Sequence, residues 1–369
     1  MRFSCPSHEL QRGTQIAVRA TPSRPTTVPI LSNVLIQAVD SQVILTCYDQ
    51  EVGIRVTLPA VVEVAGEATC HAKTLSDLMN DLPAADVVVS LDDRQNVTLS
   101  CGKSEFTLAG LAPEDFPLLP DVGDDTRFLI QSSLLRDVIK QTIFAVCDDE
   151  SRPALTGVFF SIEPDKLTAV STDTHRLCIR EVNLPGLVGE TEIILPARAL
   201  DQFTRALPTD TDPTVEIRIA RNQAQLQCSG VTVVSRLVEG PFPHYQRVLP
   251  SGFDKLLTVE REPLLRALKR VAVVARSEKA HRVVLKGTDA LLELTSESSG
   301  VGRVYEEVPS TLEGEQVELV FNCGYLTDVL SVMEWKVVRL EVSGKLTPCI
   351  VRGEDDETYR YVVMPMQMA

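Results

Sequence analysis

Ser171, Asp173 and His175 place the three side-chain types of a hydrolase triad within one short segment. In such a triad the imidazole takes the proton of the serine hydroxyl, and the carboxylate orients the imidazole. Triad members normally come from separate segments, and the chain has no Gly-x-Ser-x-Gly turn that would expose a nucleophilic serine. Asp173 and Thr174 also suit a tight turn. A hydrolase on this scaffold stays an alternative, which reaction with an active-serine probe would test.

The other residues that could do chemistry form no metal or cofactor pattern. No His-Glu-x-x-His motif and no glycine-rich phosphate loop occurs. The nine cysteines are scattered singly without a Cys-x-x-Cys pair, so neither a zinc site nor a disulfide framework is indicated, and we expect buried free thiols. The sequence therefore predicts no catalytic residue, metal site or cofactor. The isolated histidines are His8, His71, His244 and His281.

The composition is typical of a large globular protein outside the membrane. With 369 residues and 44% hydrophobic content, the chain can bury several separate cores. No apolar run approaches the roughly 18 residues of a membrane span. The first residues also lack the apolar core of a signal peptide, so we expect a cytoplasmic protein. The net charge of −15 argues against general coating of nucleic acid but leaves room for a local basic surface.

The chain repeats one pattern three times. Residues 72–78 (Ala-Lys-Thr-Leu-Ser-Asp-Leu) precede a Leu-Pro pair, as do residues 197–203 (Ala-Arg-Ala-Leu-Asp-Gln-Phe), and a third copy begins at Leu326. The period of about 125 residues is that of a whole domain rather than of a solenoid unit. Turn-rich segments near residues 121–125 and 251–253 suit domain boundaries. We predict domains at residues 1–122, 123–251 and 252–369.

Each repeat has the pattern of an α+β domain with two helices and about eight short strands. Apolar residues at helical spacing predict helices within residues 134–146, 200–207, 264–275 and 326–333. Alternating or continuous apolar runs predict strands at residues 34–38, 43–46, 87–91, 97–100, 158–161, 215–219, 291–294 and 337–342.

The exposed faces of these helices are basic. In residues 264–275 the apolar side chains share one face, while Arg266 and Arg270 lie on the opposite face. Arg136 and Lys140 likewise lie outside the apolar stripe of their helix. Any amphipathic helix has a charged wet side, so one such helix is no evidence for a ligand. Repetition in an acidic chain does indicate a basic surface. The other helices contribute Lys73, Arg198 and Arg205.

Domain size connects this surface with DNA. A domain of ~120 residues has a diameter of roughly 35 Å. Three such spheres in a closed ring leave almost no hole, whereas six leave a hole about as wide as one sphere. A DNA duplex, roughly 20 Å wide, would pass through the larger hole. Two copies of the chain joined head to tail supply six domains.

Segments along the whole chain resemble the bacterial DNA polymerase III β subunit, the sliding clamp. They are residues 29–33 (Pro-Ile-Leu-Ser-Asn), 171–177 (Ser-Thr-Asp-Thr-His-Arg-Leu), 236–240 (Arg-Leu-Val-Glu-Gly) with 242–250 (Phe-Pro-His-Tyr-Gln-Arg-Val-Leu-Pro), and 361–366 (Tyr-Val-Val-Met-Pro-Met). The resemblance implies three repeated DNA-clamp domains that close as a head-to-tail dimeric ring. It implies a processivity factor rather than an enzyme: the ring encircles duplex DNA without reading its sequence and tethers DNA polymerases, after a clamp-loading ATPase has opened it.

The resemblance also implies three functional surfaces. A groove accepts short linear motifs from DNA polymerases and clamp-loader subunits, and its matching positions are Arg152, Leu155, Thr172, His175, Arg176, Leu177, Phe242, Pro243, Arg247, Val248, Val362, Val363, Met364, Pro365 and Met366. The residues expected to face DNA are Arg24, Lys73, Arg136, Lys140, Arg198, Arg205, Arg266 and Arg270. The residues expected at the dimer interface are Phe106, Leu108, Val273 and Val274.

The chain departs from the family pattern beside the groove. Thr174 stands where a glycine is common, Pro153 and Ala154 replace bulkier residues, and the chain ends Gln-Met-Ala at residues 367–369. The motif preference of the groove is therefore open. The sequence also does not separate the main replicative clamp from a clamp paralogue that serves antibiotic resistance or a mobile element.

Overall fold

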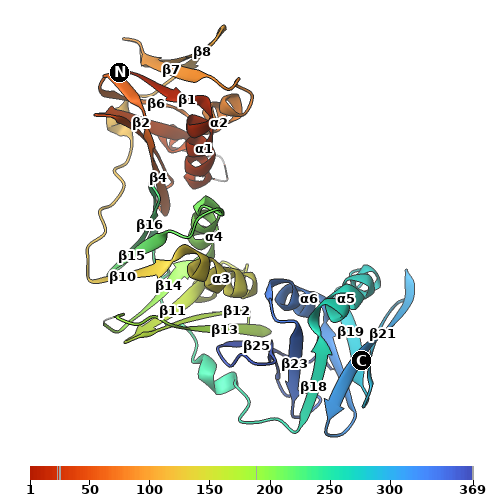
Figure 1. The fold of residues 1–369 in the computed structure, drawn as a ribbon. Helices are drawn as coiled ribbons and strands as arrows, with labels where there is room; N and C mark the ends of the chain where they lie inside the picture. The colour runs from red at the N-terminus through yellow and green to blue at the C-terminus, as the bar shows by residue number, and fades with distance from the viewer. Residues whose placement is uncertain (23, 25, 188, 368–369) are drawn as a thin grey trace. The chain divides into compact units, whose positions relative to one another are not determined.

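The structure, a computed structural model, describes residues 1–22, 24, 26–187 and 189–367. Met368 and Ala369 of the atypical C-terminal tail lie outside the described residues. Helices are separated by runs of consecutive antiparallel strands, which confirms the predicted α+β class (Figure 1). The six α-helices among the described residues are α1 Ser7–Ala17, α2 Ala72–Asn80, α3 Ser132–Thr142, α4 Ala197–Ala206, α5 Arg261–Ala275 and α6 Cys323–Val332. None of these helices is long and apolar enough to cross a membrane.

The fold divides into two compact units, each built from two separate stretches of chain. The first unit comprises Met1–Leu135 and Arg198–Leu237, and the second comprises Arg136–Ala197 and Val238–Ala369. The chain therefore contributes the middle repeat partly to one unit and partly to the other.

The first unit contains two antiparallel sheets. The five-stranded sheet has the order β5-β1-β7-β8-β9, and its strands are β1 Arg2–Pro6, β5 Val61–Val64, β7 Asp86–Leu91, β8 Asn96–Cys101 and β9 Ser104–Ala109. The eight-stranded sheet has the order β10-β15-β16-β17-β4-β3-β2-β6, and its strands are β2 Asn33–Val39, β3 Gln42–Tyr48, β4 Val52–Pro59, β6 Gly66–His71, β10 Thr126–Gln131, β15 Thr214–Ala220, β16 Gln223–Cys228 and β17 Val231–Arg236. Pairing of β17 with β4 joins the second repeat to the first in one sheet.

The second unit is organised around twelve strands in the order β14-β11-β12-β13-β25-β24-β23-β18-β21-β20-β19-β22. Their bounds are β11 Gly157–Glu163, β12 Lys166–Thr172, β13 Arg176–Asn183, β14 Thr191–Pro196, β18 Lys255–Glu260, β19 Arg282–Gly287, β20 Leu291–Ser298, β21 Gly302–Glu313, β22 Val317–Asn322, β23 Val337–Val342, β24 Cys349–Gly353 and β25 Tyr359–Val363. Antiparallel pairing of β25 with β13 brings the C-terminal strand against the middle repeat.

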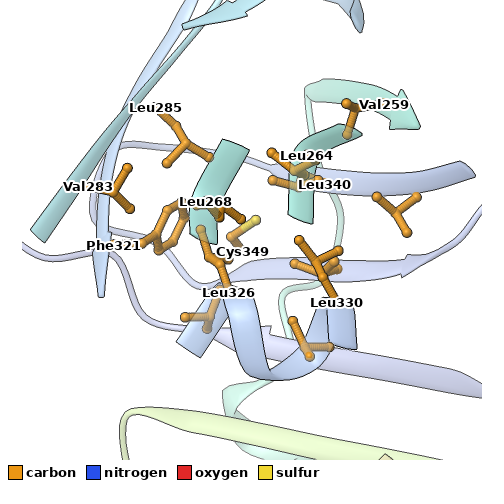
Figure 2. Packing of buried hydrophobic residues seen from close by; sticks show 14 of the residues in the cluster. Val259, Leu264, Leu268, Val283, Leu285, Phe321, Leu326, Leu330, Leu340 and Cys349 are labelled. Atoms are coloured by element: carbon orange, nitrogen blue, oxygen red, sulfur yellow. The ribbon is translucent and has the colours of Figure 1, made fainter. Parts of the chain in front are cut away.

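The core of the last repeat shows why its apolar spacing produces these elements. Helices α5 and α6 pack together, and Figure 2 shows Leu264 and Leu268 of α5 directed toward Leu326 and Leu330 of α6 among strand residues. Each of these leucines is at most 2% exposed. Burying one such side chain contributes about 1.5–3 kcal/mol to the stability of the fold. Because the leucines recur at the 3.6-residue period of a helix, both segments can bury them on one face only as helices. The Asn322 side chain caps α6 by accepting a hydrogen bond from the backbone N–H of Gly324 at 2.8 Å.

Two of the open strand edges within the described part of the chain lie at or beside the residues predicted for the dimer interface. β9 is the last strand of its sheet and pairs with β8 alone. The long strand β21 pairs with β18 only over residues 310–313, so residues 302–309 have β20 as their single strand partner. Unpaired N–H and C=O groups on such edges can pair with another chain.

Candidate functional site

A cavity of about 220 Å³ lies in the second unit at the place where the groove is predicted. Eight predicted residues line it: Thr172, His175, Arg176, Leu177, Pro243, Val248, Val362 and Met364. Thr174, His244 and Tyr245 also line it but were absent from the predicted set. The signal for these three was present, since all lie inside the two segments, 171–177 and 242–250, that carry the family resemblance.

The C-terminal strand forms one wall of this cavity. Leu177 on β13 is the register partner of Val362 on β25. Just beyond the strand, the backbone N–H of Met364 donates to the carbonyl of His175 at 3.0 Å. The Met364 side chain is 39% exposed, which is unusual for an apolar residue fixed in place by its backbone. An exposed, positioned methionine suits an adaptable apolar contact.

Aromatic packing supports the opposite wall. The ring of Phe242 stacks on Phe159 with centroids 4.8 Å apart, and Tyr245 lies 6.4 Å from Phe159. These residues belong to a small apolar cluster that also contains Leu177 and Val362. The segment that follows the middle repeat is thereby anchored beside the cavity, although it has little regular secondary structure.

A tight turn between β12 and β13 forms the floor of the site. The Asp173 carboxylate accepts hydrogen bonds from the backbone N–H groups of His175 and Arg176 at 2.9 and 3.0 Å. The Thr172 hydroxyl donates to the carbonyl of Arg176 at 2.7 Å. Thr174 is held at φ 79°, a region that favours glycine and strains a β-branched residue. The hydrogen bonds within this turn therefore hold Thr174 in a conformation that glycine would adopt without strain.

The arrangement is not that of a hydrolase triad. Ser171 is fully buried, and its hydroxyl donates to the carbonyl of Thr142 at 2.6 Å. The Asp173 carboxylate is engaged with backbone N–H groups and with Arg176. The His175 ring stacks instead against Tyr325, with centroids 6.4 Å apart. Ser171 therefore belongs to strand β12, and Asp173 and His175 belong to the turn that follows it.

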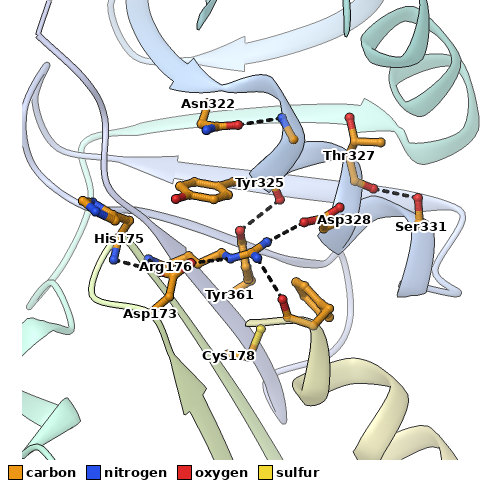
Figure 3. A network of polar contacts seen from close by, with 12 residues as sticks. Asp173, His175, Arg176, Cys178, Asn322, Tyr325, Thr327, Asp328, Ser331 and Tyr361 are labelled. Atoms are coloured by element: carbon orange, nitrogen blue, oxygen red, sulfur yellow. Dashed lines mark hydrogen bonds and ion pairs between the residues drawn. The ribbon is translucent and has the colours of Figure 1, made fainter. Parts of the chain in front are cut away.

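Arg176 connects this turn to helix α6 (Figure 3). Its guanidinium donates to Asp173 at 2.9 Å, to Asp328 at 2.6 Å and to the carbonyl of Phe144 at 2.8 Å. It also lies 4.5 Å from the centre of the Tyr325 ring, a cation–π distance. The side chain is only 11% exposed, so it lines the cavity mainly as a structural support. Burial lowers the pKa of Arg176, but Tyr361, Asp328 and Asp173 outweigh burial and raise it overall.

The other predicted groove residues do not line this cavity. Leu155 and Val363 are buried, and Phe242 packs behind the wall. Arg152 and Arg247 are exposed, and Arg152 lies 3.9 Å from Asp149. Pro365 and Met366 continue past the cavity, and the backbone N–H of Met366 donates to the carbonyl of Val320 at 2.7 Å. Met366 lines a second cavity of about 290 Å³ with Glu318, Val320, Lys345, Leu346 and Gln367.

Most of the basic residues expected to face DNA lie on helices, and several are paired with carboxylates. Arg205 on α4 binds Asp201 at 2.9 Å, and Arg266 on α5 binds Glu262 at 2.9 Å. Lys140 lies 3.1 Å from Glu334. The other pairs are Arg270 with Glu306 and Arg198 with Asp49. Arg24 and Lys73 are exposed, and Arg136 is partly buried.

The residues predicted at the dimer interface lie beside the two open strand edges. Phe106 and Leu108 are half-buried on β9. Val273 on α5 is 72% exposed, and Val274 is half-buried. Glu306 of the open half of β21 accepts two hydrogen bonds from Arg270 of α5, at 2.6 and 2.7 Å, so this helix and this edge are joined.

Comparison with known proteins gives a consistent result over the whole chain. Family models of the DNA polymerase III beta subunit match its N-terminal domain to residues 1–120, its central domain to residues 129–244 and its C-terminal domain to residues 246–367. The beta sliding clamp of Staphylococcus epidermidis is 31% identical over 351 residues, 93% of each chain. The crystal structure of the DNA polymerase sliding clamp from Bacillus subtilis matches with a TM-score of 0.94 at 29% identity and covers 100% of both chains. The sliding clamp from Pseudomonas aeruginosa matches with a TM-score of 0.91 at 30% identity, again over 100% of both chains. With its three clamp domains, this chain belongs to the DNA polymerase III beta subunit family.

Proposed function

We propose that this chain is a DNA sliding clamp, a processivity factor that encircles duplex DNA as a ring-shaped homodimer. The observation that carries this proposal is the match of all three family domains to one chain. A topological link explains why an acidic protein can act on DNA, because a closed ring needs no strong contact to stay on a duplex. The protein would act in the cytoplasm, without catalysing a reaction and without a cofactor.

Ring closure would use the two open strand edges. We propose that β9 of one chain pairs with residues 302–309 of β21 in a second chain, which would continue both sheets across the interface. Phe106 and Leu108 on the first edge would pack against Val273 and Val274 beside the second edge. The exposure of Val273 supports this assignment, because burial of an exposed valine on association is favourable. A head-to-tail contact of this kind closes a dimer through two identical interfaces.

Duplex DNA would contact the basic faces of the helices through its phosphates. Lysine and arginine contacts to phosphates hold a protein on DNA without reading the bases. The set proposed to face DNA remains Arg24, Lys73, Arg136, Lys140, Arg198, Arg205, Arg266 and Arg270.

The cavity beside the C-terminal strand would take the motifs of DNA polymerases and clamp-loader subunits. Its walls of Leu177, Val248, Val362 and Met364 suit apolar side chains of an extended peptide. Arg152 and Arg247 are exposed and would contact the peptide, whereas Arg176 would support the turn. A dimer carries two such grooves, so two partners could bind at once.

A paralogue with a specialised role in antibiotic resistance or mobile-element replication is the less favoured reading. The matched relatives are named as beta sliding clamps, and the matched structures are those of DNA polymerase sliding clamps.

Retention on circular DNA tests the proposed function directly. The protein is loaded onto a nicked circular plasmid with its own clamp loader and ATP, and the mixture is separated by gel filtration. We expect the protein to elute with the circular plasmid and to be released when one restriction cut makes the plasmid linear. Equal retention on circular and linear DNA, or retention without a clamp loader, would contradict the proposal that the protein encircles DNA as a ring.

The groove is tested separately with a fluorescent peptide from the C-terminus of the replicative polymerase. Met364→Lys should weaken peptide binding by about tenfold or more, because it places a charge on an apolar wall. Leu118→Lys is the matched control, since Leu118 is also an exposed apolar residue, at 90%, but lies outside the cavity. Equal losses in both variants would contradict the assignment of the groove.

A further inference from the structure

Two arginines expected to face DNA are neutralised by an acidic residue one turn earlier on the same helix. On α4, Nε of Arg205 donates to Asp201 at 2.9 Å. On α5, Nε of Arg266 donates to Glu262 at 2.9 Å. The two pairs have the same i, i+4 spacing and the same order, with the carboxylate toward the helix N-terminus.

Both pairs are open to solvent. The side chains of Arg205 and Asp201 are 65% and 39% exposed, and those of Arg266 and Glu262 are 69% and 50% exposed. The hydrogen bond from Arg266 lowers the pKa of Glu262, so this carboxylate is ionised at neutral pH. The guanidinium groups therefore lie at the protein surface, where a phosphate can reach them.

The pattern extends beyond these two helices. Of the eight basic residues expected to face DNA, Lys140, Arg198, Arg205, Arg266 and Arg270 all have a carboxylate partner in the same chain. Arg198 and Arg270 are bound to carboxylates that are 7% and 20% exposed, so these two pairs are less accessible. Glu334, the partner of Lys140, is 64% exposed and lies outside the helix of its lysine. Asp201 and Glu262 are the two accessible carboxylates that bind an arginine of their own helix.

A carboxylate and a phosphate compete for a guanidinium because both accept its paired N–H groups. Exchange of one for the other on the protein surface is close to neutral in free energy, because exposed ion pairs are weak. A phosphate that approaches Arg205 or Arg266 also meets the negative charge that it displaces. The contact is thereby weakened, and the protein can move from one phosphate to the next at little cost.

We propose that Asp201 and Glu262 weaken the grip of the clamp on DNA by competing with phosphates for Arg205 and Arg266. This inference rests on the proposed function, in which α4 and α5 face the duplex. Under it, the two acids set the strength of a sliding contact. If the ion pairs only stabilise their helices, their removal will change helix stability and leave DNA binding unaltered.

The experiment measures binding of the intact protein to a fluorescein-labelled duplex of about 30 base pairs, by anisotropy, between about 50 and 200 mM salt. D201N/E262Q removes both carboxylates and retains side-chain size. A carboxylate and a phosphate about 7 Å apart in water repel by an amount that corresponds to roughly threefold in affinity. Salt of about 50 mM screens this repulsion and reduces the factor to just under twofold at each site. With two sites in each of two subunits, the four factors multiply, so we expect binding about tenfold tighter at the lowest salt and a steeper loss of affinity as salt rises.

Two further variants separate the possible results. Glu63 lies on β5, at the sheet edge opposite β9, and its carboxylate binds Arg2 at 2.8 Å. E63Q removes this carboxylate and should leave DNA binding unchanged. R205Q/R266Q should weaken binding at low salt if α4 and α5 face DNA. Weaker binding by R205Q/R266Q together with unchanged binding by D201N/E262Q would contradict the proposed competition by the two acids but leave the DNA-facing role of α4 and α5 intact. Unchanged binding by both double variants would overturn the DNA-facing role of these helices as well. An equal gain in affinity from E63Q would show that the gain comes from the net charge of the protein, and this result would also contradict the proposal.

Discussion

The guanidinium of Arg176 lies 2.6 Å from the carboxylate of Asp328 and so joins the turn under the cavity to helix α6. Asp328 follows Tyr325 by one helical turn, and the Tyr325 ring contacts both Arg176 and His175. The hydroxyl of Tyr361, on the C-terminal strand, donates to the carbonyl of Tyr325 at 2.9 Å. The turn, α6 and β25 are thus held by one network, so the shape of the groove depends on Arg176 (Figure 3).

Replacing Arg176 should therefore damage both stability and the groove. Arg176→Met removes the side-chain hydrogen bonds to Oδ2 of Asp173 and to the carbonyl of Phe144, and we expect a loss of about 2–4 kcal/mol in unfolding free energy. Asp328→Asn is the matched control, because Asp328 is 44% exposed and should cost no more than about 1 kcal/mol. Urea unfolding measures both, and equal costs would show that Arg176 does not organise the network.

Replacing Thr174 by glycine should stabilise the turn. Release of a β-branched residue from φ 79° gains roughly 1–2 kcal/mol, and the greater freedom of an unfolded glycine takes back about 0.5–1 kcal/mol. We expect a net gain of about 0.5–1 kcal/mol in unfolding free energy, together with a wider cavity, since Thr174 lines it. Thr174→Asn serves as the control, because asparagine tolerates this conformation without the entropy of glycine. Destabilisation in both variants would mean that side-chain contacts of Thr174 outweigh its strain.

Charges at the exposed valines of α5 should prevent dimer formation. Val273→Glu with Val274→Glu would place four carboxylates in the two proposed apolar interfaces of each dimer, and burial of unpaired charges is costly. We expect folded monomers in sedimentation velocity at micromolar concentration. Leu118→Glu, at another exposed apolar position, should remain dimeric. A dimer of unchanged sedimentation coefficient in the valine variant would place the interface elsewhere.

The cysteines should react very unevenly with a thiol reagent. Burial raises the pKa of Cys5 to about 11 and that of Cys70 to about 12, and the reactive thiolate is correspondingly scarce at neutral pH. Cys147 is the one cysteine of the nine that is not fully buried. We therefore expect one fast thiol per native chain with Ellman's reagent and nine after denaturation. Cys147→Ser should remove the fast reaction, and its persistence would show that another cysteine is accessible.

The sequence predicted the elements well because their signals are local. Apolar spacing placed a helix at residues 264–275, and the structure has α5 at Arg261–Ala275. The strand predicted at residues 337–342 coincides with β23. The pairing of β13 with β25 joins residues about 180 positions apart, and no local pattern carries that information. The family resemblance assigned residues of both segments to one groove but did not predict that the two strands pair.

The resemblance located the cavity but not the state of each side chain. It gave Arg176 as a residue of the groove, whereas the structure surrounds its guanidinium with Asp173, Asp328 and the carbonyl of Phe144. It gave Arg205 and Arg266 as basic residues without indicating that each is paired with an acid four residues earlier. Such partners depend on rotamers and on neighbouring elements, so the residue type alone does not determine whether a cation is available to a ligand.

A last prediction concerns the acid sensitivity of the second unit. Asp356 precedes β25 and accepts hydrogen bonds from Nη1 of Arg180 at 2.9 Å and from the backbone N–H of Thr358 at 2.6 Å. Burial raises the pKa of Asp356, but the hydrogen bonds from Thr358 and Arg180 outweigh burial and lower it below its usual value. Because the folded pKa is depressed, this carboxylate stabilises the fold above its unfolded pKa of about 3.9, and the stabilisation is lost as pH falls through the folded pKa.

Asp356→Asn should therefore lose stability at pH 7 but lose progressively less as the pH falls. We expect a deficit of about 1.5 kcal/mol in unfolding free energy at neutral pH, since hydrogen bonds to a charged acceptor are lost. The deficit should shrink below about pH 4, where the wild-type carboxyl also begins to be protonated in the unfolded chain. Asp355→Asn, a change at the exposed neighbour, should leave stability nearly unchanged at every pH. Urea unfolding of the three proteins across this range decides the matter, because a deficit that stays constant with pH would come from lost packing and not from the ionised carboxylate of Asp356.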